Sequence, residues 1–234
     1  MAFASYLYGS PSGFDGAYDK FCNHVPGKVN LDNLEHLGHL FTFLRQWGCR
    51  QFTKEGQDQA KVLIAKWFRE YERCLPEWST DIWTLPDDKL KTTSEAYGSL
   101  VLLKAGKKKN GQRPGVGATG AAKILFVLRP KSLMAWDDAI TEYLGLGKDA
   151  GSYGKFLRDV QCMVDDFRKE CEKHGISLKQ VPAELGHAPH MTVPKLIDEY
   201  LWLTLSQKRS LPDPRVLGDW KNWANAILQA RQAK

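Results

Sequence analysis

Apolar residues recur at spacings of three and four along most of the chain, and this helical period constrains the fold more than any other feature. In residues 31–47 four apolar side chains share one helical face: Leu34, Leu37, Phe41 and Leu44. No segment alternates strictly between apolar and polar residues, so the sequence predicts an all-α fold. The expected helices cover residues 31–47, 57–75, 90–104, 119–128, 151–174, 195–207 and 216–232, with a short one opened by Asp137 and Asp138.

Size and charge narrow the class of protein. With 234 residues, 43% of them hydrophobic, the chain can bury a core in one domain or two closely packed lobes. The net charge of +6 favours a polyanionic partner. No apolar run reaches the length of a membrane span, and residues 1–10 lack the layout of a signal peptide. We therefore expect an intracellular protein with no membrane partner.

The cysteine and histidine residues give no firm cofactor site. Five cysteines are widely spread, and no four of them have iron–sulfur spacing, so we expect reduced thiols and no iron–sulfur cluster. One thiolate and three imidazoles have short spacings that resemble a zinc site, but this is an unusual ligand set. We assign no metal to these residues, which are Cys171, His174, His187 and His190.

The glycine-rich segment 114–128 carries the functional argument. Gly115 and Gly117 allow a tight turn, and the small residues that follow begin a helix whose free N–H groups point back at that turn. Such a helix start suits a phosphate, although an ordinary helix start looks the same in sequence. The candidate phosphate-binding residues are Gly115, Val116, Gly117, Ala118 and Thr119, together with Lys108, Lys109 and Arg113 from the basic loop 107–113.

This segment resembles the second half of the helix-hairpin-helix in DNA glycosylases of the endonuclease III and adenine glycosylase superfamily. The family pattern is Pro-Gly-Val-Gly, a helix of small residues and then an essential aspartate. Here Pro114 begins the pattern and Asp137 stands twenty-three positions later, which is the family spacing. The match covers about thirty residues of the chain.

The resemblance implies a fold, a partner and a chemistry. The fold would be a two-lobed helical unit, with one lobe over about 30–136 including the hairpin and the other over about 137–234 with the N-terminal segment. The partner would be double-stranded DNA, from which a nucleotide is flipped out for hydrolysis of its N-glycosidic bond. Asp137 would stabilise the oxocarbenium-like sugar and orient the water. The resemblance adds no cofactor beyond a monovalent cation that the hairpin could hold.

A lysine nucleophile is missing from its family position. Bifunctional relatives carry a lysine where this chain has Thr119, so the resemblance implies a monofunctional enzyme. Lys123 lies one helical turn further along and could partly substitute in a deeper cleft.

Simpler interpretations exist for the remaining candidates. Asp137 or Asp138 could merely cap a helix, and Asp138 would be the catalytic carboxylate if the register slips by one. Trp136 could stack on an extruded base or pack in the core. The whole chain could also be a non-catalytic helix-hairpin-helix DNA-binding protein, or a helical protein-interaction domain whose glycines only permit close packing.

Overall fold

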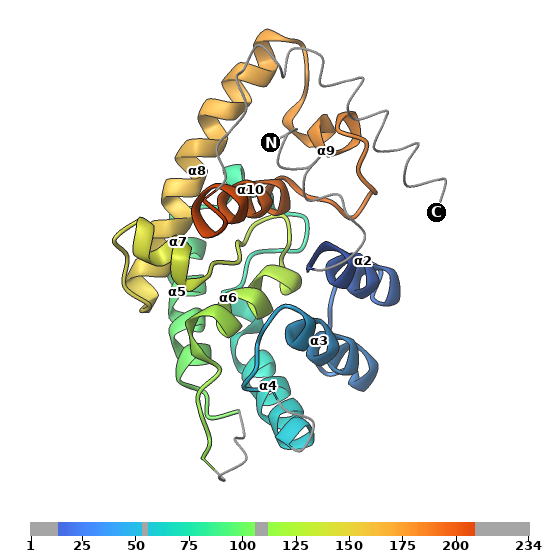
Figure 1. Ribbon diagram of the computed structural model, residues 1–234, viewed down its shortest axis with the longest axis vertical. Coiled ribbons are helices and arrows are strands. Elements are labelled where there is room, and N and C mark those ends of the chain that lie inside the picture. Colours follow the sequence, from blue (N-terminus) through green and yellow to red (C-terminus); the bar gives the residue numbers. More distant parts are fainter. Residues whose placement is uncertain (1–13, 53–55, 106–111, 209–234) are drawn as a thin grey trace.

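The computed structural model describes residues 14–52, 56–105 and 112–208, and within these ranges it contains helices and no strand. Figure 1 shows the helices arranged around α6, with α8 along one side and α2, α3 and α4 along the other. The prediction of an all-α fold is confirmed. No helix of the described part is long and apolar enough to cross a membrane.

The N-terminal helices are α2 (Phe14–His24), α3 (Leu34–Gln46) and α4 (Gln57–Tyr71). The helix α3 begins after Asn33, whose side chain accepts hydrogen bonds from the backbone N–H groups of Glu35 and His36. The sequence did not predict α2, because its first residues lie in a glycine-rich stretch. A short 3-10 turn, Glu72–Cys74, continues α4, so the helix predicted over 57–75 is divided in two.

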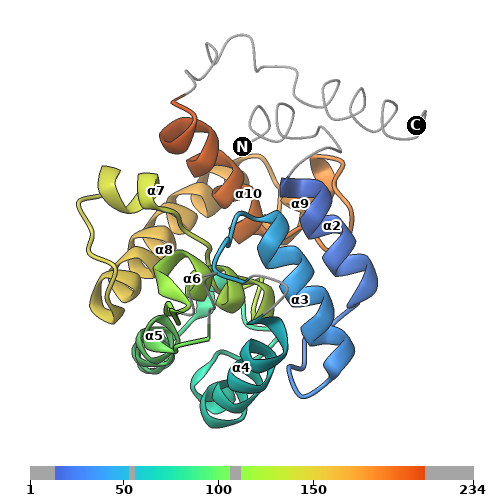
Figure 2. The same cartoon turned by 60° about the horizontal axis from the view of Figure 1, so that its bottom comes forward.

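The two helices around the glycine-rich segment are α5 (Asp87–Leu102) and α6 (Gly117–Leu128), with a 3-10 turn at Ile82–Thr84 before them. Both predicted helices exist, and α6 starts two residues earlier than expected, at Gly117 itself. From Gly120 to Leu128 every residue of α6 except Lys123 is buried. Figure 2 shows why: α6 lies between α5, α3 and α10. The glycine-rich segment therefore starts the central helix of the core.

The next pair comprises α7 (Asp138–Tyr143) and the long α8 (Ala150–Lys173). Both were predicted within a residue of their observed starts. Small residues let α8 cross close to α5: a Cβ added at Gly98 would lie 3.1 Å from the Cβ of Ala150. One added at Gly154 would lie 2.6 Å from the hydroxyl of Ser94.

The described chain ends in short elements. The segment 175–194, predicted to be irregular, contains a 3-10 turn at Leu178–Gln180 and the single-turn α9 (Val181–Glu184). The helix predicted over 195–207 consists of α10 (Val193–Leu201) followed by a π-helical turn, Trp202–Ser206. The helix predicted over 216–232 lies outside the described residues.

One cluster of buried apolar side chains joins these elements, from Ala17 on α2 to Leu201 on α10. At its centre Phe126 of α6 stacks on Trp47, with ring centroids 5.8 Å apart, and Tyr18 packs against both rings. These aromatic contacts hold α2 and the end of α3 against the C-terminal part of α6.

Candidate functional site

The glycines of the turn before α6 have two different roles. Gly117 has φ +73°, a left-handed conformation that favours glycine, and a Cβ added there would meet nothing within 4 Å. Gly115 is needed for packing, because a Cβ there would lie 2.8 Å from the carbonyl oxygen of Val101 on α5. The turn thus fits tightly onto the end of α5 and is open at Gly117.

The backbone donors of the turn are fewer than the sequence indicated. The N–H of Val116 donates to the carbonyl oxygen of Leu103 at 2.9 Å, and the Val116 side chain is buried. Val116 therefore has no backbone donor left for a phosphate, and we correct the predicted set. Gly117, Ala118 and Thr119 form the first turn of α6, are half-buried, and receive no side-chain cap. Their N–H groups lie at the positive end of the helix dipole.

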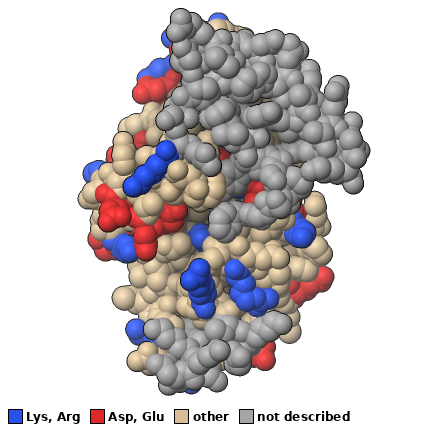
Figure 3. All heavy atoms as spheres, in the orientation of Figure 1, with Lys and Arg blue, Asp and Glu red and all other residues tan. Residues whose placement is uncertain are grey.

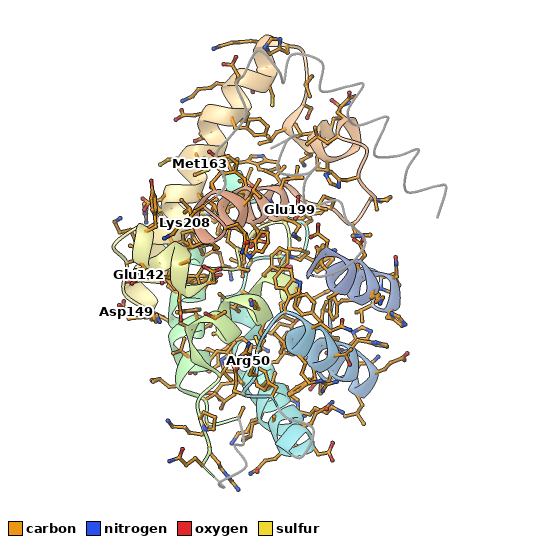
Figure 4. All side chains as sticks on the ribbon, in the orientation of Figure 1. Arg50, Glu142, Asp149, Met163, Glu199 and Lys208 are labelled. Atoms are coloured by element: carbon orange, nitrogen blue, oxygen red, sulfur yellow. The ribbon has the colours of Figure 1, made fainter. Side chains whose placement is uncertain are left out.

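Two basic side chains accompany this turn. Arg113 is exposed four positions before Gly117. Arg50 is exposed beside Gln51, whose side-chain amide donates to the carbonyl oxygen of Val116 at 2.6 Å. This hydrogen bond holds the loop after α3 against the start of α6. Figure 4 shows Arg50 in the lower half of the molecule, near the start of α6. The predicted Lys108 and Lys109 lie outside the described residues.

Asp137 occupies the N-cap of α7, so the capping interpretation is confirmed. Its Oδ1 accepts a hydrogen bond from the N–H of Ile140 at 2.9 Å, and its Oδ2 accepts one from the hydroxyl of Ser206, also at 2.9 Å. The side chain is half-buried and lines a pocket of about 90 Å³. Asp138 is exposed and forms an ion pair with Lys148 at 2.8 Å, so the fallback position lies outside this pocket.

Lys123 links the pocket to the glycine turn. It lies on α6, six residues after Gly117, which corresponds to about 9 Å along the helix axis. Its ammonium donates to the backbone carbonyl of Trp47 and lies 5.5 Å from the centroid of the Trp47 indole ring. Lys123 therefore supplies a positive charge to the wall of the pocket that Asp137 also lines. Its hydrogen bond and cation–π contact favour a charged, fixed side chain over a nucleophile.

Trp136 belongs to the core. It is 1% exposed, and its ring packs against Tyr97, Tyr153 and Phe156 with centroids 5.2 to 5.8 Å apart. An extruded base has no access to a ring face that is already covered, so the base-stacking prediction for Trp136 is wrong. The half-buried Trp202, from the π-helical turn, is the pocket's more accessible aromatic side chain.

A buried ion cluster lies directly behind the pocket. Lys195 is 0% exposed, and its ammonium contacts Asp15 Oδ1 at 2.9 Å, Glu199 Oε1 at 3.0 Å and Asp198 Oδ2 at 3.4 Å. Burial raises the pKa of both Glu199 and Asp198, and the charge of Lys195 offsets only part of this rise. The resulting pKa of Glu199 is about 7. Asp198 also lines the pocket of Asp137, so cluster and pocket share one wall. In Figure 4 Glu199 lies on α10, on the side toward α2.

Sequence reasoning missed this cluster and Arg50. A lysine followed by acids at positions i+3 and i+4 is a helical ion-pair spacing, and it was the available signal for Lys195, Asp198 and Glu199. Nothing in the sequence connects Asp15 to α10, or the segment of Arg50 and Gln51 to the start of α6, because the contacts of Asp15 and Gln51 join distant segments.

Charge is divided unevenly over the face shown in Figure 3. Basic side chains lie in the middle of its lower half, whereas acidic side chains gather at one edge, over α7 and the start of α8. Glu142 and Asp149 lie at that edge in Figure 4. A polyanion would therefore approach from the α6 side of the pocket. In the described part of the chain, no three His, Cys, Asp or Glu side chains are grouped as metal ligands.

Comparisons of the chain with protein-family models, with curated proteins and with solved structures gave no match. A functional assignment therefore rests on the geometry of the turn and the pocket.

Proposed function

We propose that the chain is a monofunctional DNA glycosylase, which binds duplex DNA through the first turn of α6 and hydrolyses an N-glycosidic bond at Asp137. The observation that carries the proposal is that α6 joins the two sites. Its first residue is the open Gly117, and its Lys123 lines the pocket of Asp137. The proposal includes the expected division into two lobes, in which Asp137 would begin the lobe over about 137–234 with the N-terminal segment.

The proposed grip on DNA combines backbone and side-chain groups. The N–H groups of Gly117, Ala118 and Thr119 would bind one phosphate, which the helix dipole favours. Arg50 and Arg113 flank this turn from separate segments and would contact neighbouring phosphates. These contacts hold the backbone and read no base.

The proposed reaction consumes one water molecule. Its oxygen bonds to C1′ of the extruded nucleotide while the C1′–N bond breaks and its electrons pass to the leaving base. Asp137 stabilises the positive charge on the sugar and takes one proton from the water. The leaving base takes up one proton from solvent, and Asp137 returns its proton to solvent, so that the carboxylate is regenerated. The products are a free base and an abasic site.

The size of the pocket favours a second candidate, a DNA-binding protein without catalysis. Its volume of about 90 Å³ is below the roughly 300–1,000 Å³ of typical ligand pockets. A base can therefore enter only if a wall moves, and the binding protein needs no such movement. The two candidates make opposite predictions for a variant of Asp137.

The test is abasic-site formation on duplexes that carry uracil, 8-oxoguanine, alkylated purines, mismatches or phage-type modified bases. We expect Asp137→Asn to keep DNA affinity and to lower turnover by about 100-fold or more, because the carboxylate acts on the reacting atoms. Asp149→Asn is the matched control, since Asp149 also caps a helix but does not line the pocket of Asp137. A parent chain that releases no base from any duplex would refute the glycosylase proposal. An Asp137→Asn variant with full turnover would show that Asp137 is not the catalytic carboxylate.

DNA affinity at several salt concentrations tests the grip. Arg50→Gln and Arg113→Gln should each reduce the slope of log K against log salt by about 0.9, because each removes one phosphate contact. Lys173→Gln is the control, because this lysine lies at the end of α8 and pairs with Glu170. Affinity that does not depend on salt would instead support a protein-interaction domain.

A further inference from the structure

Both oxygens of the Asp137 carboxylate are held by hydrogen bonds, and the two donors come from different parts of the chain. Ile140 belongs to the helix that Asp137 caps. Ser206 lies 69 residues away in sequence, and its hydroxyl is 2.9 Å from Oδ2. Capping α7 requires only the first donor, so the second one needs another explanation.

Ser206 reaches Asp137 from the π-helical turn that follows α10. The N–H of Gln207 donates to the carbonyl oxygen of Trp202 at 2.9 Å, five residues earlier, which is the π pattern. Turns of this kind are rare and are frequently found at functional sites. Here the first residue, Trp202, lines the pocket, and the last, Ser206, bonds the carboxylate. The turn thus contributes to the pocket at both of its ends.

We infer that Ser206 is the positioning residue of Asp137: its hydroxyl fixes the plane of the carboxylate at the pocket. A carboxylate held only through Oδ1 can rotate about its Cβ–Cγ bond, and the second hydrogen bond removes that freedom. The lone pairs that neither donor uses then keep a constant direction toward a water or sugar atom in the pocket. The catalytic consequence rests on the proposed glycosylase function, whereas the orientation itself does not.

The cap of α8 shows what a purely structural arrangement looks like. Asp149 accepts hydrogen bonds from the N–H and the hydroxyl of a single residue, Ser152, both at 3.0 Å. Asp149 is exposed, Ser152 is half-buried, and the pair is complete within one turn. Removing the Ser152 hydroxyl therefore provides a matched control for removing that of Ser206.

The inference is tested by Ser206→Ala, Ser206→Thr and the control Ser152→Ala. On the duplex that the parent chain cleaves, we expect Ser206→Ala to lower kcat by roughly 10- to 100-fold, as for loss of a hydrogen bond to a charged group, with KM unchanged. Ser206→Thr should restore the rate, since it restores the hydroxyl, and Ser152→Ala should keep it. Full kcat in Ser206→Ala, or a loss that Thr does not restore, would overturn the inference.

A crystal structure of Ser206→Ala separates this inference from the proposed function. We expect the Asp137 carboxylate to rotate away from its present plane, and an unchanged carboxylate would refute the positioning role whatever the activity. A rotated carboxylate in a chain that cleaves no duplex would refute the glycosylase proposal and leave the positioning role intact.

Discussion

Asp137 and Asp149 cap neighbouring helices with the same chemistry, and they differ in where the second hydrogen bond originates. Each accepts an N–H from three residues ahead and a serine hydroxyl. For Asp149 both donors belong to Ser152, and the group is exposed. For Asp137 the hydroxyl comes from Ser206, and the group faces a pocket. A local cap only starts a helix, whereas a cap completed by a distant segment also fixes that segment at a site.

The largest expected effect concerns the buried ion cluster of Lys195, which holds α10 and, through it, the turn that carries Ser206. Lys195→Met should lower the free energy of unfolding by about 3–5 kcal/mol, because it leaves the buried carboxylates of Asp15, Asp198 and Glu199 without their counter-charge. Because α10 leads into the turn that carries Ser206, loss of the ion cluster should also weaken the hydrogen bond from Ser206 to Asp137. Urea denaturation measures the change, with the surface variant Lys173→Met as control. A loss below about 1 kcal/mol would mean that the cluster does not stabilise α10.

An intermediate effect is expected on the pH dependence of stability, which differs between Glu199 in the buried cluster and the exposed Asp149. Burial raises the pKa of Glu199 from 4.5 to about 7, so the folded chain binds more protons than the unfolded chain in that window. Stability should therefore fall as pH rises from about 4.5 to about 7. Hydrogen bonds from Ser152 lower the pKa of Asp149, so the contribution of Asp149 to stability has the opposite pH dependence. This contribution is lost as the pH falls below the ordinary pKa of an aspartate.

Glu199→Gln checks this sign, because glutamine keeps a carbonyl acceptor for Lys195 and cannot ionise. At pH 8 the variant should be more stable than the parent by on the order of 1–3 kcal/mol, and at pH 4.5 the difference should vanish. Denaturation at both pH values measures it. Equal stability of variant and parent at pH 8 would contradict the prediction.

The smallest effect concerns the caps themselves. Asp137→Ala should lower stability by about 1 kcal/mol, the usual cost of an N-cap. Asp149→Ala should lower it by less, because water replaces the lost acceptor at an exposed position. Thermal melting of both variants measures the difference. A larger loss for Asp149→Ala would show that the distant hydroxyl adds nothing to the cap.

What the sequence predicted was set by local interactions. The helical period identified α3 to α6 and α8, and the cap chemistry of Asp137 follows from its own turn. A tight turn at Gly115 and Gly117 was likewise expected from two glycines before a helix. What it missed depends on contacts between distant segments: Ser206 on Asp137, Asp15 on Lys195, and Gln51 on Val116. Burial also decided against Trp136, because only packing determines whether an aromatic face is covered.

The helix α6 imposes a strict register on the proposed site. Deleting a single residue between Gly117 and Lys123 would turn the lysine by about 100° around the axis and draw it about 1.5 Å closer to the turn. The ammonium would then leave the wall of the pocket that Asp137 lines, although every residue type needed for the site would still be present. Changes in length are therefore compatible with this site only outside that six-residue interval.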